Sequence, residues 1–251
     1  MSRKIGLIGG LGWPATVAYY EAICRAAKLD GHKGSPEMAI ESLDMSVTVA
    51  ARGVAGDEKS WSRFDEIFRQ ALGRLSAAGC DCAAIASVTP HNRLDAIARD
   101  TPLPVISVVD AVTDRVRPGT HSKAIVLGTS VTMNGNLFDD GLAEVGVTTI
   151  QPNKNDVPGM TSLLEDFFYT GRAIEGRNSL IAFIRSIVAD QRSVLIILAC
   201  TDLTPAFPES VGQARFTANG FDFLDATAAH VAAILKAAEI EFSDQPVSKR
   251  M

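Results

Sequence analysis

The sequence predicts an α/β protein made of two similar domains, each with a parallel sheet flanked by helices. Apolar runs of strand length alternate with amphipathic segments of helical period along the whole chain, as expected for parallel strands joined by crossover helices. The alternation restarts after residues 117–122, although no sequence repeat is exact. The chain has 251 residues and is 47% hydrophobic, which is enough for one large or two modest domains.

The first half begins with the apolar run "KIGLIGG" (4–10), which ends in glycines as a buried parallel strand does. Pro14 stands where the first position of a helix is expected, and "ATVAYYEAICRAA" continues at helical spacing. The same signals predict strands at 37–44, 82–87 and 104–110, and helices at 60–79 and 91–100.

The second half repeats this order. The patterns predict a strand and turn in 123–133, a helix at 137–146, a strand at 147–152, helices at 161–171 and 178–191, a strand running into a loop in 193–205, and a short strand with a closing helix in 221–240. The closing helix could return to the first half. We therefore expect a first domain of residues 1–115 plus about 218–251, and a second domain of about 116–217.

Charge and composition exclude several classes of function. The formal net charge is −5 and the basic residues are scattered, so we expect neither a nucleic-acid nor a membrane surface. The start "MSRKIGLIGGLG" resembles a signal peptide, but glycines and Trp13-Pro14 interrupt it, and we expect a cytoplasmic protein. The four cysteines have neither metal nor disulfide spacing, which predicts reduced thiols and no metal: Cys24, Cys80, Cys82 and Cys200.

Candidate functional residues follow the predicted strands. Ligands of open parallel sheets bind beyond the carboxyl ends of the strands. "AAIASVT" and "LIILACT" are similar apolar runs, the first ending at Ser87 and the second at Cys200. If the two halves face each other, these two side chains meet across a cleft. The distinctive strand ends are Gly9–Trp13, Asp44–Arg52, Ser87–His91 and Cys200–Thr204.

Each candidate also has a structural explanation. Cys200 could be a small buried apolar residue, and Arg52 could be a solvated side chain rather than a carboxylate clamp. His91 could be a helix cap or an anion contact. Ser87 lacks the G-x-S-x-G elbow of a hydrolase. "GGLGWPA" fits a dinucleotide fingerprint, but the acidic residue expected about 20 positions later is not clear, and we expect no such cofactor.

Five stretches in order resemble the aspartate/glutamate racemase family of cofactor-independent amino-acid racemases. They are "IGLIGGLGWPAT" at the N-terminus, "SVTPH" (87–91), "VLGTSVTM" (126–133), "LACTDL" (198–203) and "FLDATAAH" (223–230). The resemblance implies two α/β domains with the active site in the cleft between them. It also implies a small acidic substrate, catalysis without a cofactor, and a homodimer.

The resemblance also suggests roles for individual residues. Typical members carry Cys-Asn-Thr at the first site and Cys-Thr-Glu at the second. Cys200-Thr201-Asp202 matches the second, whereas Ser87-Val88-Thr89 matches the first only through its threonine. A lysine found in the family before a glycine is replaced here by Tyr169. The implied catalytic residues are Cys200 and Ser87, and the implied substrate-binding residues are Arg52, Thr89, Thr201, Gly10, Leu11 and Val88.

Three functions remain open at this point. Racemisation without a cofactor needs an acid and a base on opposite faces of Cα, and a thiol suits either role better than a serine hydroxyl. The first hypothesis is an aspartate/glutamate-type racemase with Cys200 opposite Ser87. The second is a decarboxylase of a malonate-like acid that needs only Cys200. The third is a non-catalytic ligand-binding member of the family.

Overall fold

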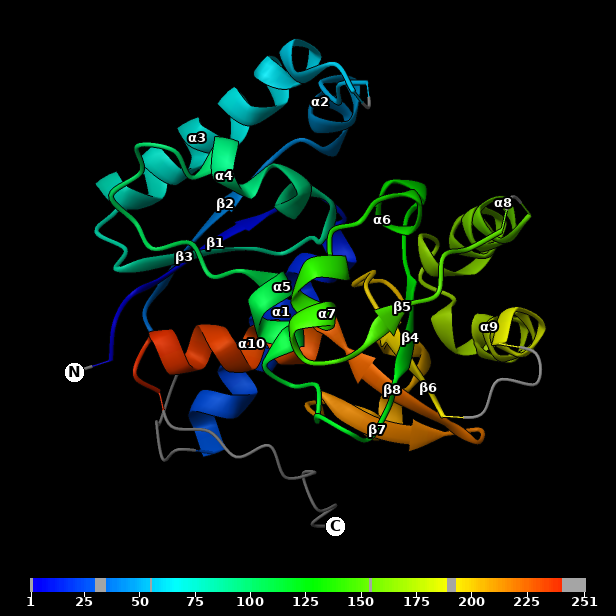
Figure 1. The fold of residues 1–251 in the computed structure, drawn as a ribbon. Coiled ribbons are helices and arrows are strands. Elements are labelled where there is room, and N and C mark those ends of the chain that lie inside the picture. The colour runs from blue at the N-terminus through cyan, green and yellow to red at the C-terminus, as the bar shows by residue number, and fades with distance from the viewer. Residues whose placement is uncertain (1, 30–34, 55, 154, 189–192, 241–251) are drawn as a thin grey trace. The chain divides into compact units, whose positions relative to one another are not determined.

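The computed structural model describes residues 2–29, 35–54, 56–153, 155–188 and 193–240. These residues form a three-stranded sheet of order β2-β1-β3 and a five-stranded sheet of order β5-β4-β6-β8-β7 (Figure 1). The chain divides into two compact units. One is Met1–Ser107 with the segment that starts at Val231, and the other is Val108–His230. The predicted α/β class with parallel sheets is confirmed.

The three-stranded sheet forms the centre of the first unit. β1 (Ile5–Gly9) is buried along its whole length and pairs in parallel with β2 (Met38–Ser42) and β3 (Cys82–Ile85). Its side chains alternate between two cores, as strand geometry requires. Ile5 and Leu7 pack with apolar residues of α1 (Trp13–Leu29) and α10 (Ala226–Ala237). Ile8 packs with those of α3 (Ser62–Ala77).

Two predictions for the first half are wrong in detail. Residues 104–110 do not form a strand: only Val105 bridges Ala83, and α5 (Val108–Thr113) follows. The run is short and apolar, and periodicity alone does not separate such a strand from a helix. The predicted helix 91–100 is split into the 3₁₀ helix η2 (Thr89–Arg93) and α4 (Leu94–Ile97), with Pro90 in the first turn of η2.

The five-stranded sheet forms the core of the second unit. β4 (Lys123–Leu127) and β6 (Val194–Leu198) lie at its centre, and the mostly apolar face of α9 (Ala173–Val188) packs on them. The strands pair in parallel except at β7 (Arg215–Ala218), which runs antiparallel to β8 (Phe221–Asp225). Asn219 and Gly220 join the last two strands, both with positive φ as a type I′ hairpin turn requires. β7 was not predicted from the sequence, although Asn-Gly is a strong hairpin signal.

The remaining elements complete the two units. They are α2 (Met45–Ala50), η1 (Glu58–Trp61), α6 (Ser130–Asn134), α7 (Asp139–Glu144), β5 (Thr148–Thr149), α8 (Asp156–Leu163), the π-helical turn η3 (Leu164–Phe168), η4 (Thr204–Ala206) and η5 (Pro208–Ser210). No helix among the described residues is long and apolar enough to cross a membrane.

The predicted domain boundary near residue 218 differs from the observed sheet. β8 pairs with β6 and therefore belongs to the five-stranded sheet of the second unit, and the two units divide inside α10 at Val231. The segment "FDFLD" has the pattern of a strand but carries no signal for the sheet that it joins. The end of the predicted helix at residues 189–191, and residues 241–251 of the predicted first domain, lie outside the described residues.

Candidate active site

In the first unit, segments that follow all three strands meet at one small pocket, called here the Ser87 pocket. Its free volume is about 10 Å³, which is room for a small polar group rather than a whole amino acid. The structure therefore brings together four site residues that were predicted separately from the sequence, namely Leu11, Arg52, Ser87 and Thr89. The lining residues are Leu11, Thr48, Val49, Arg52, Phe64, Ser87, Thr89 and Pro90.

Gly10 fits the turn after β1 closely against the segment after β2. Its φ is +78°, and a Cβ atom placed there would lie 2.1 Å from the carbonyl oxygen of Leu43. The amide of Leu43 donates to the carbonyl of Gly9 at 2.9 Å. Only glycine permits both the conformation and the approach. Gly10 thus supports the position of Leu11 without lining the Ser87 pocket itself.

Arg52 is placed by the short helix α2, which the sequence analysis did not predict. Asp44 caps the helix by accepting hydrogen bonds from the amide and hydroxyl of Ser46 at 2.8 and 2.6 Å. These bonds lower the pKa of the Asp44 carboxyl. The helix ends at Ala50, and the amide of Arg52 donates to the carbonyl of Val49 at 3.2 Å. The side chain of Arg52 then reaches the Ser87 pocket from an exposed position.

Ser87 follows β3 and is held by a turn that His91 closes. Nδ1 of His91 donates to the carbonyl oxygen of Ser87 at 3.0 Å, since that oxygen can only accept. Burial lowers the pKa of His91 to about 4, so the ring is neutral at physiological pH. His91 therefore supports this turn, and it is not in the lining of the Ser87 pocket. Val88 is also buried and outside the lining.

Cys200 closes β6 in the second unit, where all five strand residues are buried. Its side chain is 6% exposed, and Sγ donates to Oδ2 of Asp202 at 3.7 Å. Burial, and then the charge of Asp202, raise the pKa of the Cys200 thiol, and burial raises the pKa of Asp202. At rest the thiol is therefore protonated and donates to the carboxylate of Asp202. Thr201 is buried next to this pair.

The loop after Cys200 is tied to a buried carboxylate that the sequence analysis did not assign. Oδ1 of Asp225, at the end of β8, accepts a hydrogen bond from the hydroxyl of Thr204 at 3.1 Å. The same oxygen accepts the amides of Thr227 and Ala228 at 2.8 and 3.2 Å, which caps α10. Asp225 is 2% exposed, and burial raises its pKa to about 6. The signal was present in "FLDAT", an aspartate directly before a helix.

We expect Asp225 to make the stability of the fold decrease as pH rises from about 4 to about 6. Its folded pKa lies above the unfolded value of 3.8, so the folded state binds more protons within this window. The shift corresponds to about 2–3 kcal/mol of unfolding free energy. Asp225→Asn keeps an acceptor at Oδ1 for all three hydrogen bonds and removes the titration. Denaturant unfolding at several pH values should show that the free energy of unfolding depends less on pH in the variant than in the wild type. The same pH dependence in both proteins would contradict this role.

A larger hollow of about 660 Å³ in the first unit is lined in part by the later residues of η2 and by α4. Glu58, Asp65, Arg69 and Arg93 are among its lining residues, and Ser87 and Arg52 are not. Arg69 and Arg93 are already paired with acidic side chains. Among the described residues, no group of three or more His, Cys, Asp or Glu side chains could hold a metal ion.

Comparison with known proteins places the chain in a family. The model of the Asp/Glu/Hydantoin racemase family matches residues 8–234, and the chain belongs to that family. It is similar to an aspartate racemase homologue from Pyrococcus horikoshii OT3, with TM-score 0.76 and 23% identity over 94% of this chain and 99% of that chain. It is also similar to the aspartate racemase of Picrophilus torridus, with TM-score 0.71 and 18% identity over 96% of each chain.

A glutamate racemase from Campylobacter jejuni subsp. jejuni is also similar, with TM-score 0.59 and 17% identity over 97% of this chain and 89% of that chain. At these identities the likeness to solved structures shows the fold alone. The predicted family and the predicted two-domain α/β fold are therefore confirmed. The substrate and the roles of individual residues are taken up next.

Proposed function

We propose that this protein is a cofactor-independent racemase of an acidic amino acid of the aspartate/glutamate type. Cys200 and Ser87 act on opposite faces of Cα, and Arg52 binds a substrate carboxylate. The observation that carries the proposal is the Ser87 pocket, which gathers a cation, a hydroxyl donor and a threonine at the end of one sheet. Membership of the racemase family supports the class of reaction. The proposal keeps the expectations of a homodimer and a cytoplasmic location.

The proton steps balance when solvent closes the cycle. Asp202 accepts the proton of the Cys200 thiol, and the resulting thiolate removes the proton from Cα of the enantiomer that presents it. The Ser87 hydroxyl then donates a proton to the opposite face. Transfer of the proton on Asp202 to the Ser87 alkoxide through solvent restores the resting enzyme. Thr89, Thr201 and Arg52 stabilise the carboxylate as it takes up enolate charge.

Ser87 is the weaker of the two acid–base groups, because a serine hydroxyl is a poor base. The two enantiomers have equal free energy, so kcat/KM is the same in both directions. A weak acid–base group on one face therefore lowers kcat/KM in both directions. The difference between the two faces is measured instead by the exchange of the α-hydrogen with solvent.

We expect the two enantiomers to exchange their α-hydrogen unequally in deuterated water. The enantiomer that faces Cys200 should exchange with retention faster than it inverts, because return from the thiol outpaces donation by Ser87. The other should show little exchange without inversion. Proton NMR on pure enantiomers of aspartate and glutamate measures both rates. Equal exchange without inversion for both enantiomers would contradict the proposed weakness of Ser87.

Two substitutions at the same position serve as controls. Ser87→Cys should raise the racemisation rate and reduce the asymmetry, since both faces then carry a thiol. Ser87→Ala should abolish inversion and leave the exchange at the Cys200 face. Absence of exchange with either amino acid would indicate a different substrate or reaction.

A specific observation favours a second candidate, the decarboxylation of a malonate-like acid. Burial and Asp202 raise the pKa of the Cys200 thiol and keep it protonated, as a donor to an enolate must be. Loss of carbon dioxide leaves an enolate that takes the proton of Cys200 on one face, and no second thiol is needed. Carbon dioxide release from aryl- or alkylmalonates separates this activity from racemisation. Thermal stabilisation by such acids without turnover would indicate a binding protein.

A further inference from the structure

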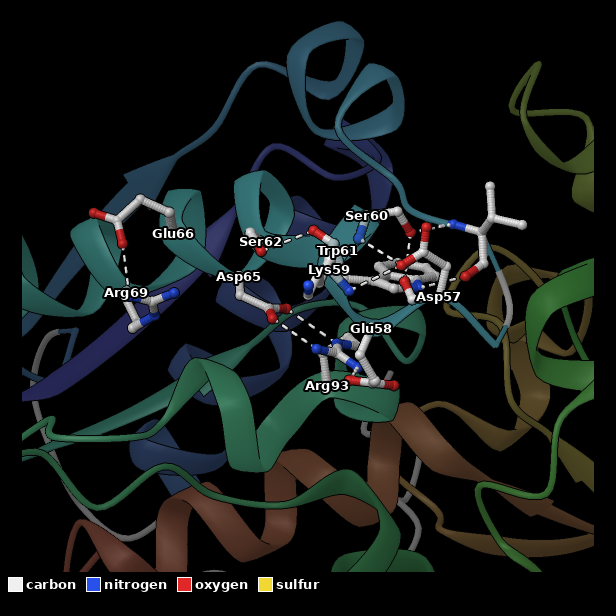
Figure 2. A network of polar contacts seen from close by, with 11 residues as sticks. Asp57, Glu58, Lys59, Ser60, Trp61, Ser62, Asp65, Glu66, Arg69 and Arg93 are labelled. Carbon is white, nitrogen blue, oxygen red and sulfur yellow. Dashed lines mark hydrogen bonds and ion pairs between the residues drawn. The ribbon is translucent and has the colours of Figure 1, made fainter.

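A cluster of side chains centred on Arg93 joins three segments of the first unit (Figure 2). Nε and Nη2 of Arg93 donate to the two carboxylate oxygens of Asp65 at 3.1 and 2.7 Å, and Nη1 donates to Glu58 at 2.6 Å. The guanidinium also lies 5.6 Å from the centre of the Trp61 ring. The cluster therefore connects η2, which carries Arg93, to η1 and α3.

The pair of Arg93 and Asp65 is the strong part of this cluster. Their side chains are 13% and 6% exposed, whereas that of Glu58 is 80% exposed. Two-point contact in a desolvated position gives a fixed geometry, and exposed ion pairs contribute little. The hydrogen bond to Asp65 is also the main reason why the pKa of Arg93 is raised.

Through Trp61 the cluster reaches the chain that carries Arg52. Nε1 of Trp61 donates to the carbonyl of Val54 at 3.1 Å. Gly53 lies so close that a Cβ atom there would be 2.6 Å from Cδ1 of Trp61. The residue immediately after Arg52 is thus packed on the indole that Arg93 covers. Trp61 also contacts Phe64, a lining residue of the Ser87 pocket, edge-on at 5.4 Å.

Arg93 is also linked through the backbone of η2 to Ser87 and Thr89, which form another wall of the Ser87 pocket. It is the last residue of η2, which begins at Thr89. Within this turn Nδ2 of Asn92 donates to the carbonyl of Thr89 at 3.0 Å, and His91 holds Ser87 as described above. One guanidinium therefore ties both walls together, although Arg93 is not itself in the pocket lining.

We propose that Arg93 is a positioning residue that sets the spacing between Arg52 and the Ser87–Thr89 turn. The assignment rests on the proposed function, in which Arg52 binds a substrate carboxylate. Misplacement of a binding group by about 1 Å can cost up to about 10²-fold in rate, so replacement of a positioning residue can have a large effect.

Arg93→Lys tests the role, because lysine keeps the charge and loses the two-point contact. We expect the Kd for succinate, a dicarboxylate probe, to rise about tenfold by calorimetry. Hydrogen exchange at the amides of Val54 and His91 should become faster. Arg69→Lys is the matched control, since Arg69 pairs with Glu66 at 2.7 Å on the same helix. It should change Kd less than about twofold.

A double-mutant cycle distinguishes positioning from general stability. In the Arg52→Ala background, Arg93→Lys should no longer weaken succinate binding, because it acts through Arg52. The same tenfold loss in both backgrounds would overturn the proposal, as would unchanged hydrogen exchange. Trp61→Phe removes the bond to Val54 and reduces the ring surface against Gly53, but keeps the Arg93–Asp65 pair. It should give a smaller loss in the same direction, which keeps the test valid if Arg93→Lys does not fold. Succinate binding that depends on Arg93, without racemisation by the wild type, would support positioning and reject the racemase.

Discussion

Replacement of Cys200 by alanine is expected to remove all measurable turnover while the protein stays folded. In the proposed reaction Cys200 is the only competent base, and a positioned acid–base group contributes about 10²–10⁴-fold to a rate. The loss should reach the upper end of this range, because Ser87 cannot replace the thiol. Chiral chromatography of aspartate and glutamate measures the turnover. Circular dichroism and thermal unfolding measure the fold.

Cys80 provides the matched control for this experiment. Like Cys200 it is a buried thiol, 7% exposed, and burial raises its pKa. It packs in the core of the first unit and does not line the Ser87 pocket. Cys80→Ala should cost about 1 kcal/mol of stability and leave turnover near the wild-type level. If Cys200→Ala kept more than about a tenth of the wild-type activity, the proton transfer would have to be assigned to another group.

Replacement of Arg52 by alanine is expected to raise KM for an acidic substrate about 30–150-fold. This range corresponds to about 2–3 kcal/mol for a charge-assisted hydrogen bond that the bound substrate shields from water. A neutral analogue that lacks the side-chain carboxylate should be affected much less. Arg52→Lys should raise KM for the acidic substrate by an intermediate amount, because lysine keeps the charge without the two-point geometry. Steady-state kinetics with both substrates on all three proteins gives the comparison.

Arg63 is a suitable control for Arg52. It is an exposed arginine near α2 and lies outside the Ser87 pocket. Arg63→Ala should leave KM for both substrates within about twofold of wild type. Equal increases for the acidic and the neutral substrate in Arg52→Ala would show that Arg52 supports the loop rather than binding a carboxylate.

Signals that are local in the chain allowed part of the site to be predicted. Ser87 and Cys200 each end an apolar run, and the structure places each at the carboxyl end of a buried parallel strand. Arg52 was selected from its loop, although α2 itself was missed. Its sequence "MSVTVA" is rich in β-branched residues, which disfavour helices, and the cap at Asp44 outweighs this preference.

The contacts between distant segments could not be predicted in the same way. Arg93 meets Asp65 from 28 positions away, and nothing in the sequence around either residue indicates the partner. The pairing of Asp225 with Thr204 likewise depends on β8 lying beside β6. Burial then shifts the pKa of Asp225 and of Cys200, and burial depends on everything packed around a group rather than on its neighbours in the chain.

The sequence by itself determined the class of this protein. Alternating periods of two and 3.6 residues define an α/β chain, and the short stretches around Ser87 and Cys200 identify the racemase family. Only the tertiary structure decided how Leu11, Arg52, Ser87 and Thr89 come to line one pocket. They follow three strands whose order in the sheet is β2-β1-β3. That order results from the packing of helices on both faces of the sheet, which the periodicity of a single segment does not encode.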